Sequence, residues 1–295
     1  MSLDVNKEVF KIWKKFSGKE EYVVNFKNLV NKNSDNQKLT GKDPLNNLCP
    51  ITYKKDEYTK PEGKEYRFLF TGFNPSFNEK HYKKCKKNDR QIIEDPYKFF
   101  RFDKNKIELD QEIIDVDYSL RNKDSKVPEG NLYEDKKGRQ QSKNYYTTYF
   151  DRLKEFIEKD IFKDRDVSDR LHHVHIDPFF IRGTNQDQAK TILMIDKNNK
   201  WEIQEEGFAE EQLNLFEKMI KSYHPTHIII LNATASHILS KRWKSNHDEK
   251  NTDTSFKYKE YIVVCGGMLF GAGGMDTYSR ERFAQEIRKH VFKKN

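Results

Sequence analysis

Four short runs of consecutive apolar residues occur along the chain, and each ends in a glycine, an asparagine or an aspartate. Runs of this length, rich in β-branched side chains, are typical of strands buried on both faces, as in a parallel sheet. The four predicted strands cover residues 66–72, 173–177, 227–232 and 261–266.

Segments with apolar residues at helical spacing alternate with these strands. The expected helices cover 9–16, 149–157, 213–220, 235–243 and 283–291. Asn232 or Thr234 is expected to cap the fourth of them. Strands that alternate with helices of this length form βαβ units. The sequence therefore predicts an α/β fold, a three-layer αβα sandwich around a central four-stranded, mostly parallel sheet.

The domain organisation follows from the same pattern. Residues 1–60 are expected to form an N-terminal helical extension, too small for a core of its own, packed on an α/β domain at 61–295. Two polar insertions interrupt that domain, at about 101–143 and 191–204. We expect a hairpin from the alternating pattern at 106–118 and a second hairpin at 191–204, around an Asp-Lys-Asn-Asn turn.

Composition limits the classes of function. Only 35% of the 295 residues are hydrophobic, but 21 Phe and 15 Tyr allow so polar a chain to bury a core. The net charge of +8 is compatible with a polyanionic partner, although many lysines are explained equally well as solvated surface. No apolar run has the length of a membrane span, and the start has no signal-peptide pattern. We expect a cytoplasmic protein without a membrane or an obligate protein partner.

The cysteines and histidines do not indicate a metal centre. Cys49, Cys85 and Cys265 are odd in number and have no ligand spacing, so neither a disulfide framework nor a zinc site is suggested. Two of the three histidines at 172, 173 and 175 alternate along a predicted strand, which favours a structural role. We therefore expect no metal.

The candidate chemistry lies at the ends of the predicted strands, because ligands of open α/β sheets bind beyond the carboxyl ends. Those ends contain Gly72, Asp177, Asn232 and a loop with five glycines between residues 266 and 274. Each of the first three is also explained as a turn or a helix cap. The glycine-rich loop permits close approach of a ligand, but it has neither common phosphate-binding pattern.

The sequence Gly72-Phe73-Asn74-Pro75-Ser76, in its place after the first strand, resembles the first motif of the uracil-DNA glycosylase superfamily. The similarity is greatest to the mismatch-specific and single-strand-selective branches, whose motif ends in Gly where this chain has Ser76. It extends in strand order over about 66–292. The resemblance implies that Asn74 orients the water that attacks the sugar, that no cofactor is needed, and that the partner is double- or single-stranded DNA.

The resemblance also implies residues that bind the base. They are Gly72, Phe73 and Asp177, with an aromatic side chain that stacks on the flipped base, for which Phe77, Tyr97, Phe99 and Phe100 are candidates. The family has an asparagine where this chain has Asp177. An ionised carboxylate only accepts hydrogen bonds, so it repels a carbonyl and prefers an exocyclic amine. Our hypothesis is that this pocket is not tuned for uracil.

The loop after the fourth strand departs from the family as well. Relatives carry His-Pro-Ser or Asn-Pro-Ser there, whereas this chain carries Gly-Met-Leu-Phe-Gly. The expected DNA-binding residues of this region are Gly266, Gly267, Met268, Leu269, Phe270, Ser279 and Arg280, with Met268, Leu269 or Phe270 as an apolar wedge. The cations expected either to hold phosphates or to form a solvated helix face are Arg182, Lys241, Arg242, Lys244, Arg280 and Arg282.

The sequence thus favours a DNA glycosylase that hydrolyses the N-glycosidic bond of a damaged or deaminated base. Two alternatives remain open on the same residues. One is a catalytically inactive protein that binds nucleic acid or a modified base on the same fold. The other is an enzyme that handles a nucleoside or nucleotide as a small molecule.

Overall fold

The computed structural model describes fifteen stretches of the 295-residue chain. They are residues 3–17, 19, 22, 49–73, 99–103, 105–106, 108–121, 132–134, 140–142, 145–163, 165–182, 186–195, 201–244, 254–270 and 274–292.

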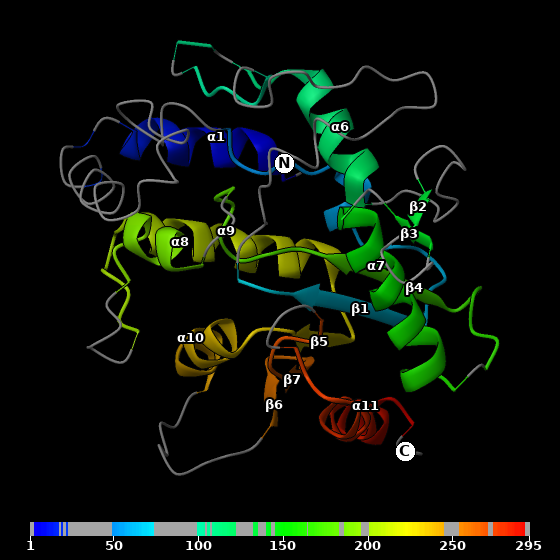
Figure 1. The fold of residues 1–295 in the computed structure, drawn as a ribbon. Coiled ribbons are helices and arrows are strands. Elements are labelled where there is room, and N and C mark those ends of the chain that lie inside the picture. The colour runs from blue at the N-terminus through cyan, green and yellow to red at the C-terminus, as the bar shows by residue number, and fades with distance from the viewer. Residues whose placement is uncertain are drawn as a thin grey trace.

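A five-stranded sheet forms the centre of the fold (Figure 1). Its strands, in spatial order, are β4 (Leu171–His175), β1 (Tyr66–Thr71), β5 (His227–Ile230), β7 (Tyr261–Cys265) and β6 (Ser255–Tyr258). The first four are parallel to their neighbours, and β6 is antiparallel to β7. A separate antiparallel pair consists of β2 (Leu132–Glu134) and β3 (Gln140–Ser142).

Helices cover both faces of the sheet. The helical elements are α1 (Val5–Phe16), η2 (Lys55–Tyr58), α6 (Gln111–Arg121), α7 (Tyr145–Glu155), its π-helical continuation η4 (Phe156–Ile161), α8 (Gln186–Ile192), α9 (Phe208–Tyr223), α10 (Ala233–Trp243) and α11 (Thr277–Val291).

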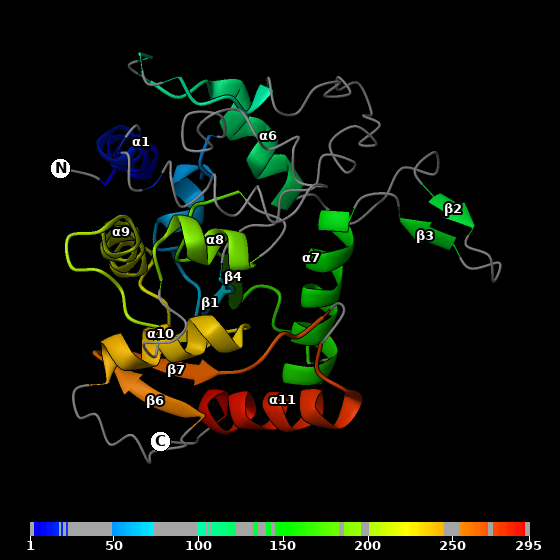
Figure 2. The same ribbon diagram turned by 60° about the vertical axis from the view of Figure 1, so that its left-hand side comes forward.

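The sheet side chains alternate between two hydrophobic clusters, as the pleat of a strand requires. On β5, Ile228 and Ile230 belong to the cluster that α1, α8, α9 and α10 share, while Ile229 belongs to the cluster of α7, η4 and α11. Figure 2 shows α9 and α11 on opposite sides of the sheet. The expected α/β class and the three-layer arrangement agree with this architecture.

The N-terminal helix is part of the first cluster. Val9, Trp13 and Phe16 are buried on one face of α1, and Trp13 and Phe16 both contact Phe208 at the start of α9. Asp4 caps the helix by accepting the Lys7 N–H at 3.1 Å. The predicted amphipathic helix therefore exists, and its apolar side chains enlarge the core of the α/β sheet.

Several predictions of local structure were wrong. The sheet has five strands and not four, because β6 pairs with β7 at the edge. The predicted hairpin at 106–118 is replaced by α6, since Ile113, Val116 and Asp117 share one inward face at helical spacing. The hairpin predicted at 191–204 does not begin as a strand, because Thr191 belongs to α8. The turn predicted at 196–199 lies outside the described residues.

Candidate functional site at the carboxyl ends of the parallel strands

The order of the parallel strands reverses at one point of the sheet. The parallel strands follow one another in the chain as β1, β4, β5 and β7, but their spatial order is β4-β1-β5-β7. The chain therefore moves from β1 to β4 on one side and then returns past β1 to β5 on the other. The topological switch point lies between β1 and β5, whose last paired residues are Thr71 and Ile230. Ligands of open α/β sheets bind at such a point.

Gly72 and Asp177 meet beyond the ends of β1 and β4 although 105 positions separate them in sequence. The Gly72 N–H donates to Asp177 Oδ1 over 2.7 Å. A Cβ atom on residue 72 would lie only 2.8 Å from the same oxygen. Glycine is therefore required here by the close approach of the carboxylate, and the predicted proximity of the two strand ends is present in the structure.

His175 approaches the same carboxylate oxygen. Its Nε2 atom lies 3.6 Å from Asp177 Oδ1, and the two side chains are only 13% and 7% exposed. The imidazole ring packs against the rings of Tyr149 and Phe150 from α7, with centroid distances of 5.6 Å each. Tyr149 in turn contacts Phe270, which belongs to the loop after β7. His175, for which a structural role was expected, therefore lies beside the candidate site.

The residues after Gly72 are only partly described. Phe73 is buried against Phe179, with ring centroids 4.9 Å apart, so its side chain is directed into the core. Asn74, and with it the stacking candidates Phe77 and Tyr97, lies outside the described residues.

Asn232 caps α10. Its Oδ1 atom accepts the Ala235 N–H at 3.0 Å, and the residue is buried. Asn232 was considered as a helix cap or as a ligand-binding residue. The structure shows it as the helix cap, and Asn232 rather than Thr234 provides that cap.

The loop after β7 is divided between core and solvent. Leu269 is buried in the second cluster, and Phe270 packs against that cluster. Leu269 is therefore a core residue, contrary to its place among the wedge candidates. Met268 is 39% exposed, and its carbonyl accepts the Met275 N–H at 2.8 Å. Met268 is thus the side chain of this predicted wedge that reaches the surface.

The two glycines that begin this loop differ in their surroundings. Gly266 has no room for a side chain, because a Cβ would lie 2.7 Å from the Phe283 ring. Its carbonyl also accepts the Ser236 hydroxyl at 3.0 Å. At Gly267 the nearest neighbour of a Cβ is the Met275 methyl group, at 3.7 Å. Only the first glycine is needed for packing.

The start of α11 lies directly beyond this loop. Asp276 accepts both the backbone N–H and the hydroxyl of Ser279, so Ser279 is engaged in capping the helix. Arg280 forms an ion pair with Asp160 at 3.3 Å. Tyr278 is 72% exposed, and the Arg282 guanidinium lies over its ring at 5.8 Å. The sequence interpretation missed Tyr278. Its spacing of four residues from Arg282 at the start of a helix could have indicated that the two side chains lie on the same helix face.

Arg182, expected among the phosphate-binding cations, is a core residue. Its side chain is fully buried and makes two hydrogen bonds to Asp117, at 2.9 and 2.5 Å. It also donates to the Cys49 and Pro50 carbonyls and lies over the Phe100 ring at 4.0 Å. A guanidinium in this position is not accessible to a phosphate, and the prediction for Arg182 was wrong.

Phe100 is wholly buried beneath Arg182, and Phe99 packs edge-on against it at 4.9 Å. Phe99 is partly buried and lies against the first cluster. Phe100 is therefore a core residue in this structure, without an exposed face on which a base can stack.

The predicted cations Lys241, Arg242 and Lys244 contact acidic, amide or aromatic side chains near the surface. Arg242 bonds to Glu217 at 2.6 Å and to Asn214, and Lys241 lies 3.9 Å from Glu202. Lys244 lies over the Phe256 ring at 5.0 Å. These contacts fit a solvated, ion-paired helix face better than a prepared row of phosphate ligands.

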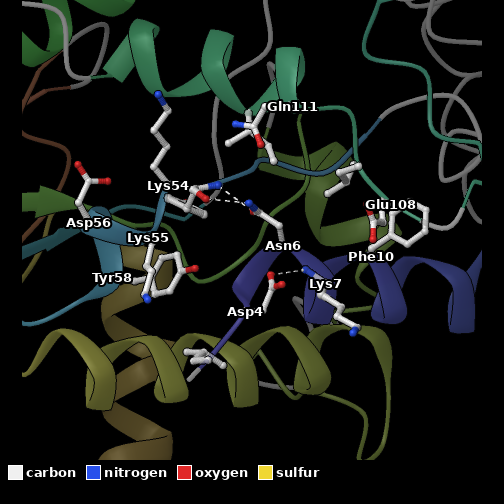
Figure 3. Close-up of a pocket in the computed structure, with 14 residues that line it drawn as sticks. Asp4, Asn6, Lys7, Phe10, Lys54, Lys55, Asp56, Tyr58, Glu108 and Gln111 are labelled. Atoms are coloured by element: carbon white, nitrogen blue, oxygen red, sulfur yellow. Dashed lines mark hydrogen bonds between the residues drawn. The ribbon is translucent and has the colours of Figure 1, made fainter. Parts of the chain in front are cut away.

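A cavity of about 920 Å³ lies elsewhere, between α1, η2 and the segment before and within α6 (Figure 3). None of the strand-end residues lines it. Its charged residues are balanced, three lysines against three carboxylates: Lys7, Lys54, Lys55, Asp4, Asp56 and Glu108. The Asn6 side chain closes one wall by pairing with both backbone polar groups of Tyr53. The balanced charge does not favour one class of ligand, so we place the candidate chemistry at the strand ends, where the strand order reverses.

The buried thiols do not add reactive groups to the site. Burial raises the pKa of the Cys49 thiol to about 12 and raises that of Cys265 as well, so both remain protonated near neutral pH. Within the described stretches, no group of three or more His, Cys, Asp or Glu side chains is placed to hold a metal ion. No helix in those stretches is long and apolar enough to cross a membrane.

Comparison with known proteins does not assign the chain to a family. No family model matches the sequence, and no curated protein matches it either.

Proposed function

We propose that this protein is a DNA glycosylase that hydrolyses the N-glycosidic bond of a damaged or deaminated base, with Asn74 orienting the attacking water. One observation carries the proposal. The Gly72-Phe73-Asn74 sequence follows β1, which borders the topological switch point on its β5 side and meets Asp177, after β4, on its other side. The proposal is supported because the start of the motif, Gly72-Phe73, directly follows a parallel strand, and open α/β sheets bind ligands beyond the carboxyl ends of such strands.

The reaction requires little of the protein beyond orientation and a suitable electrostatic environment. The bond between C1′ and the base nitrogen breaks, and its electron pair leaves with the base. The water oxygen bonds to C1′, and the proton that the water releases is balanced by the proton that the free base takes up. A side-chain amide accepts a hydrogen bond from the water without adding a charge next to the developing cation. Stabilisation of the base requires donors in a site from which water is excluded.

We assign the contact with the DNA strand to the exposed side chains of Met268, Tyr278 and Arg282, which we take together as one surface. Met268 and Tyr278 are the large hydrophobic side chains that the described residues expose. An exposed aromatic ring with a neighbouring guanidinium suits stacking on bases, and an exposed methionine suits insertion between them. This surface replaces the buried Leu269 and Arg182 in the proposal.

The test is release of the base from labelled oligonucleotides. Single- and double-stranded forms should carry uracil, hypoxanthine, xanthine or a G·T mismatch, and alkaline cleavage should reveal abasic sites. We expect product with the wild type and a loss of roughly 10²-fold or more in rate with Asn74→Ala, because the water is no longer oriented. Asn214→Ala is the matched control, since Asn214 is an exposed amide on α9 that contacts Arg242.

The outcomes separate the candidate functions. Product that disappears only in Asn74→Ala supports the glycosylase. Salt-sensitive DNA binding without product supports the inactive binding protein instead, and turnover of free nucleosides without DNA affinity supports the small-molecule enzyme. Equal rates for the wild type and Asn74→Ala would refute the role of Asn74.

A further inference from the structure

We propose that Asp177 is a positioning residue that, together with His175, fastens the end of β4 to the turn after β1 and so holds the Asn74 sequence in place, instead of reading the base. The resemblance implies the opposite role for Asp177, as the residue that binds the base. The inference rests on the proposed function for its kinetic consequence, whereas its structural part can be tested without any activity.

The first argument is the place of the carboxylate in the β1–β4 ladder. The last register pair of these strands is Phe70 with His175, and the Phe70 carbonyl accepts the Ile176 N–H at 3.0 Å. Gly72 comes directly after β1, and its backbone N–H donates to the Asp177 side chain over 2.7 Å. The carboxylate thus extends the pairing of the two strands by one hydrogen bond, directly before the Phe73-Asn74 sequence.

The second argument is space. Asp177 Oδ1 lies 2.8 Å from the point that a Cβ of residue 72 would occupy. The oxygen therefore fills the volume beside the Gly72 backbone, and this side of the turn is closed. A base that approached Oδ1 from this side would have to displace the Gly72 backbone.

The third argument is charge. A buried carboxylate is costly unless hydrogen-bond donors or cations compensate it. Here the same oxygen accepts the Gly72 N–H and lies 3.6 Å from the Nε2 atom of His175, whose ring packs against Tyr149 and Phe150. Bonds from N–H groups to a carboxylate are roughly twice as strong as neutral ones. An aspartate holds the turn more firmly than the family's asparagine for this reason, which explains the departure without a change in the target base.

Two substitutions separate positioning from base recognition. Asp177→Asn retains an oxygen that can accept the Gly72 N–H, but it changes the pattern that a base would meet, because an amide also donates. Asp177→Ala removes the acceptor altogether. Asp187→Ala is the control for loss of a carboxylate, since this side chain on α8 is largely exposed. Thermal unfolding of each variant checks that it is folded.

If Asp177 positions the turn, Asp177→Asn keeps the ranking of bases in the oligonucleotide assay. Asp177→Ala then lowers kcat by about 10²-fold while KM stays within about twofold, because the attacking water is misplaced but the substrate still binds. If Asp177 reads the base, Asp177→Asn instead shifts the preference from bases that offer an exocyclic amine towards bases that offer a carbonyl. That shift would overturn the inference.

Hydrogen exchange of the Gly72 amide gives a readout independent of catalysis. The 13 glycines of the chain yield a small spectrum when only glycine is labelled with ¹⁵N, and Gly72 is one of two that follow a threonine. We expect slow exchange in the wild type and Asp177→Asn, and exchange at least tenfold faster in Asp177→Ala. A Gly72 amide equally protected in Asp177→Ala overturns the inference. If the wild type releases no base, the proposed function fails, and this exchange rate alone decides whether Asp177 holds the turn.

Discussion

Replacement of Arg182 by methionine should strongly destabilise the fold, because it breaks a charge pair in the core. Arg182 and Asp117 are 0% and 2% exposed, and the guanidinium binds both carboxylate oxygens. The substitution also removes the donors to the Cys49 and Pro50 carbonyls. Asp117 then keeps only the Thr52 N–H and hydroxyl as the partners described for it, at 3.0 and 2.8 Å.

The magnitude follows from the desolvated charge that remains. Removal of one partner from a buried ion pair costs about 3–5 kcal/mol, because the other charge stays buried without compensation. That loss is a large part of the roughly 5–15 kcal/mol by which domains are stable. The double variant Arg182→Met/Asp117→Leu removes both charges, so it should recover most of this loss and be more stable than Arg182→Met by about 3–5 kcal/mol. The pair Arg170 and Glu65, whose side chains are 54% and 52% exposed, should contribute less than about 1 kcal/mol.

The assay is equilibrium unfolding in urea, followed by tryptophan fluorescence, for the wild type, both single variants, the double variant and Arg170→Met. An osmolyte such as trimethylamine N-oxide keeps the weakest variant folded at zero urea, and its own effect cancels in the comparison. A loss below 1 kcal/mol for Arg182→Met would refute the reasoning. So would a double variant whose loss equals the sum of the two single losses, since the two residues would then act independently.

Three further changes test other parts of the structure. Burial lowers the pKa of His227 from 6.5 to about 4. The stability that the neutral imidazole contributes is therefore complete above pH 6.5 and is lost as the pH falls towards 4, by about 3 kcal/mol in total. His227→Gln should flatten this part of the pH profile of the free energy of unfolding in urea, and an unchanged slope would contradict the assignment. Gly266→Ala should cost about 1–3 kcal/mol by forcing its Cβ against Phe283, whereas Gly267→Ala should stay within about 0.5 kcal/mol in the same unfolding assay. Tyr278→Ala should weaken binding of a single-stranded oligonucleotide, measured by fluorescence anisotropy, by roughly 5- to 150-fold, and Tyr278→Phe should not; equal affinities for all three proteins would remove Tyr278 from the proposed DNA contact.

The sequence by itself determined the elements whose pattern is local. The runs at 227–232 and 261–266 became β5 and β7, each ending one or two residues before the predicted limit. The stripe of α1 and the final helix with Phe283 and Ile287 were also found, because side chains three and four residues apart share one helix face. The glycine, asparagine and aspartate at the strand ends were also recognisable from the local sequence, because these residue types favour the turns that follow strands.

Only the tertiary structure decided which distant residues meet. The 106–118 segment reads as alternating, yet it forms a helix because Ile113 and Asp117 are both directed inward, and Asp117 pairs with Arg182 some 65 positions away. The same partner removes Arg182 from the surface, and packing draws Phe100 and Leu269 into the core while it leaves Met268 and Tyr278 exposed.

The Gly72–Asp177 contact is the clearest case. The sequence indicates two strand ends, but the 2.7 Å hydrogen bond exists because parallel pairing of β1 with β4 brings them together at one edge. Strand pairing depends on contacts between residues far apart in sequence, and the local sequence pattern does not identify the partner strand. Composition and spacing therefore cannot reveal whether a carboxylate faces a ligand or a backbone N–H. The tertiary structure decides that question, because it determines which groups at the strand ends already bond to other parts of the chain and which remain accessible.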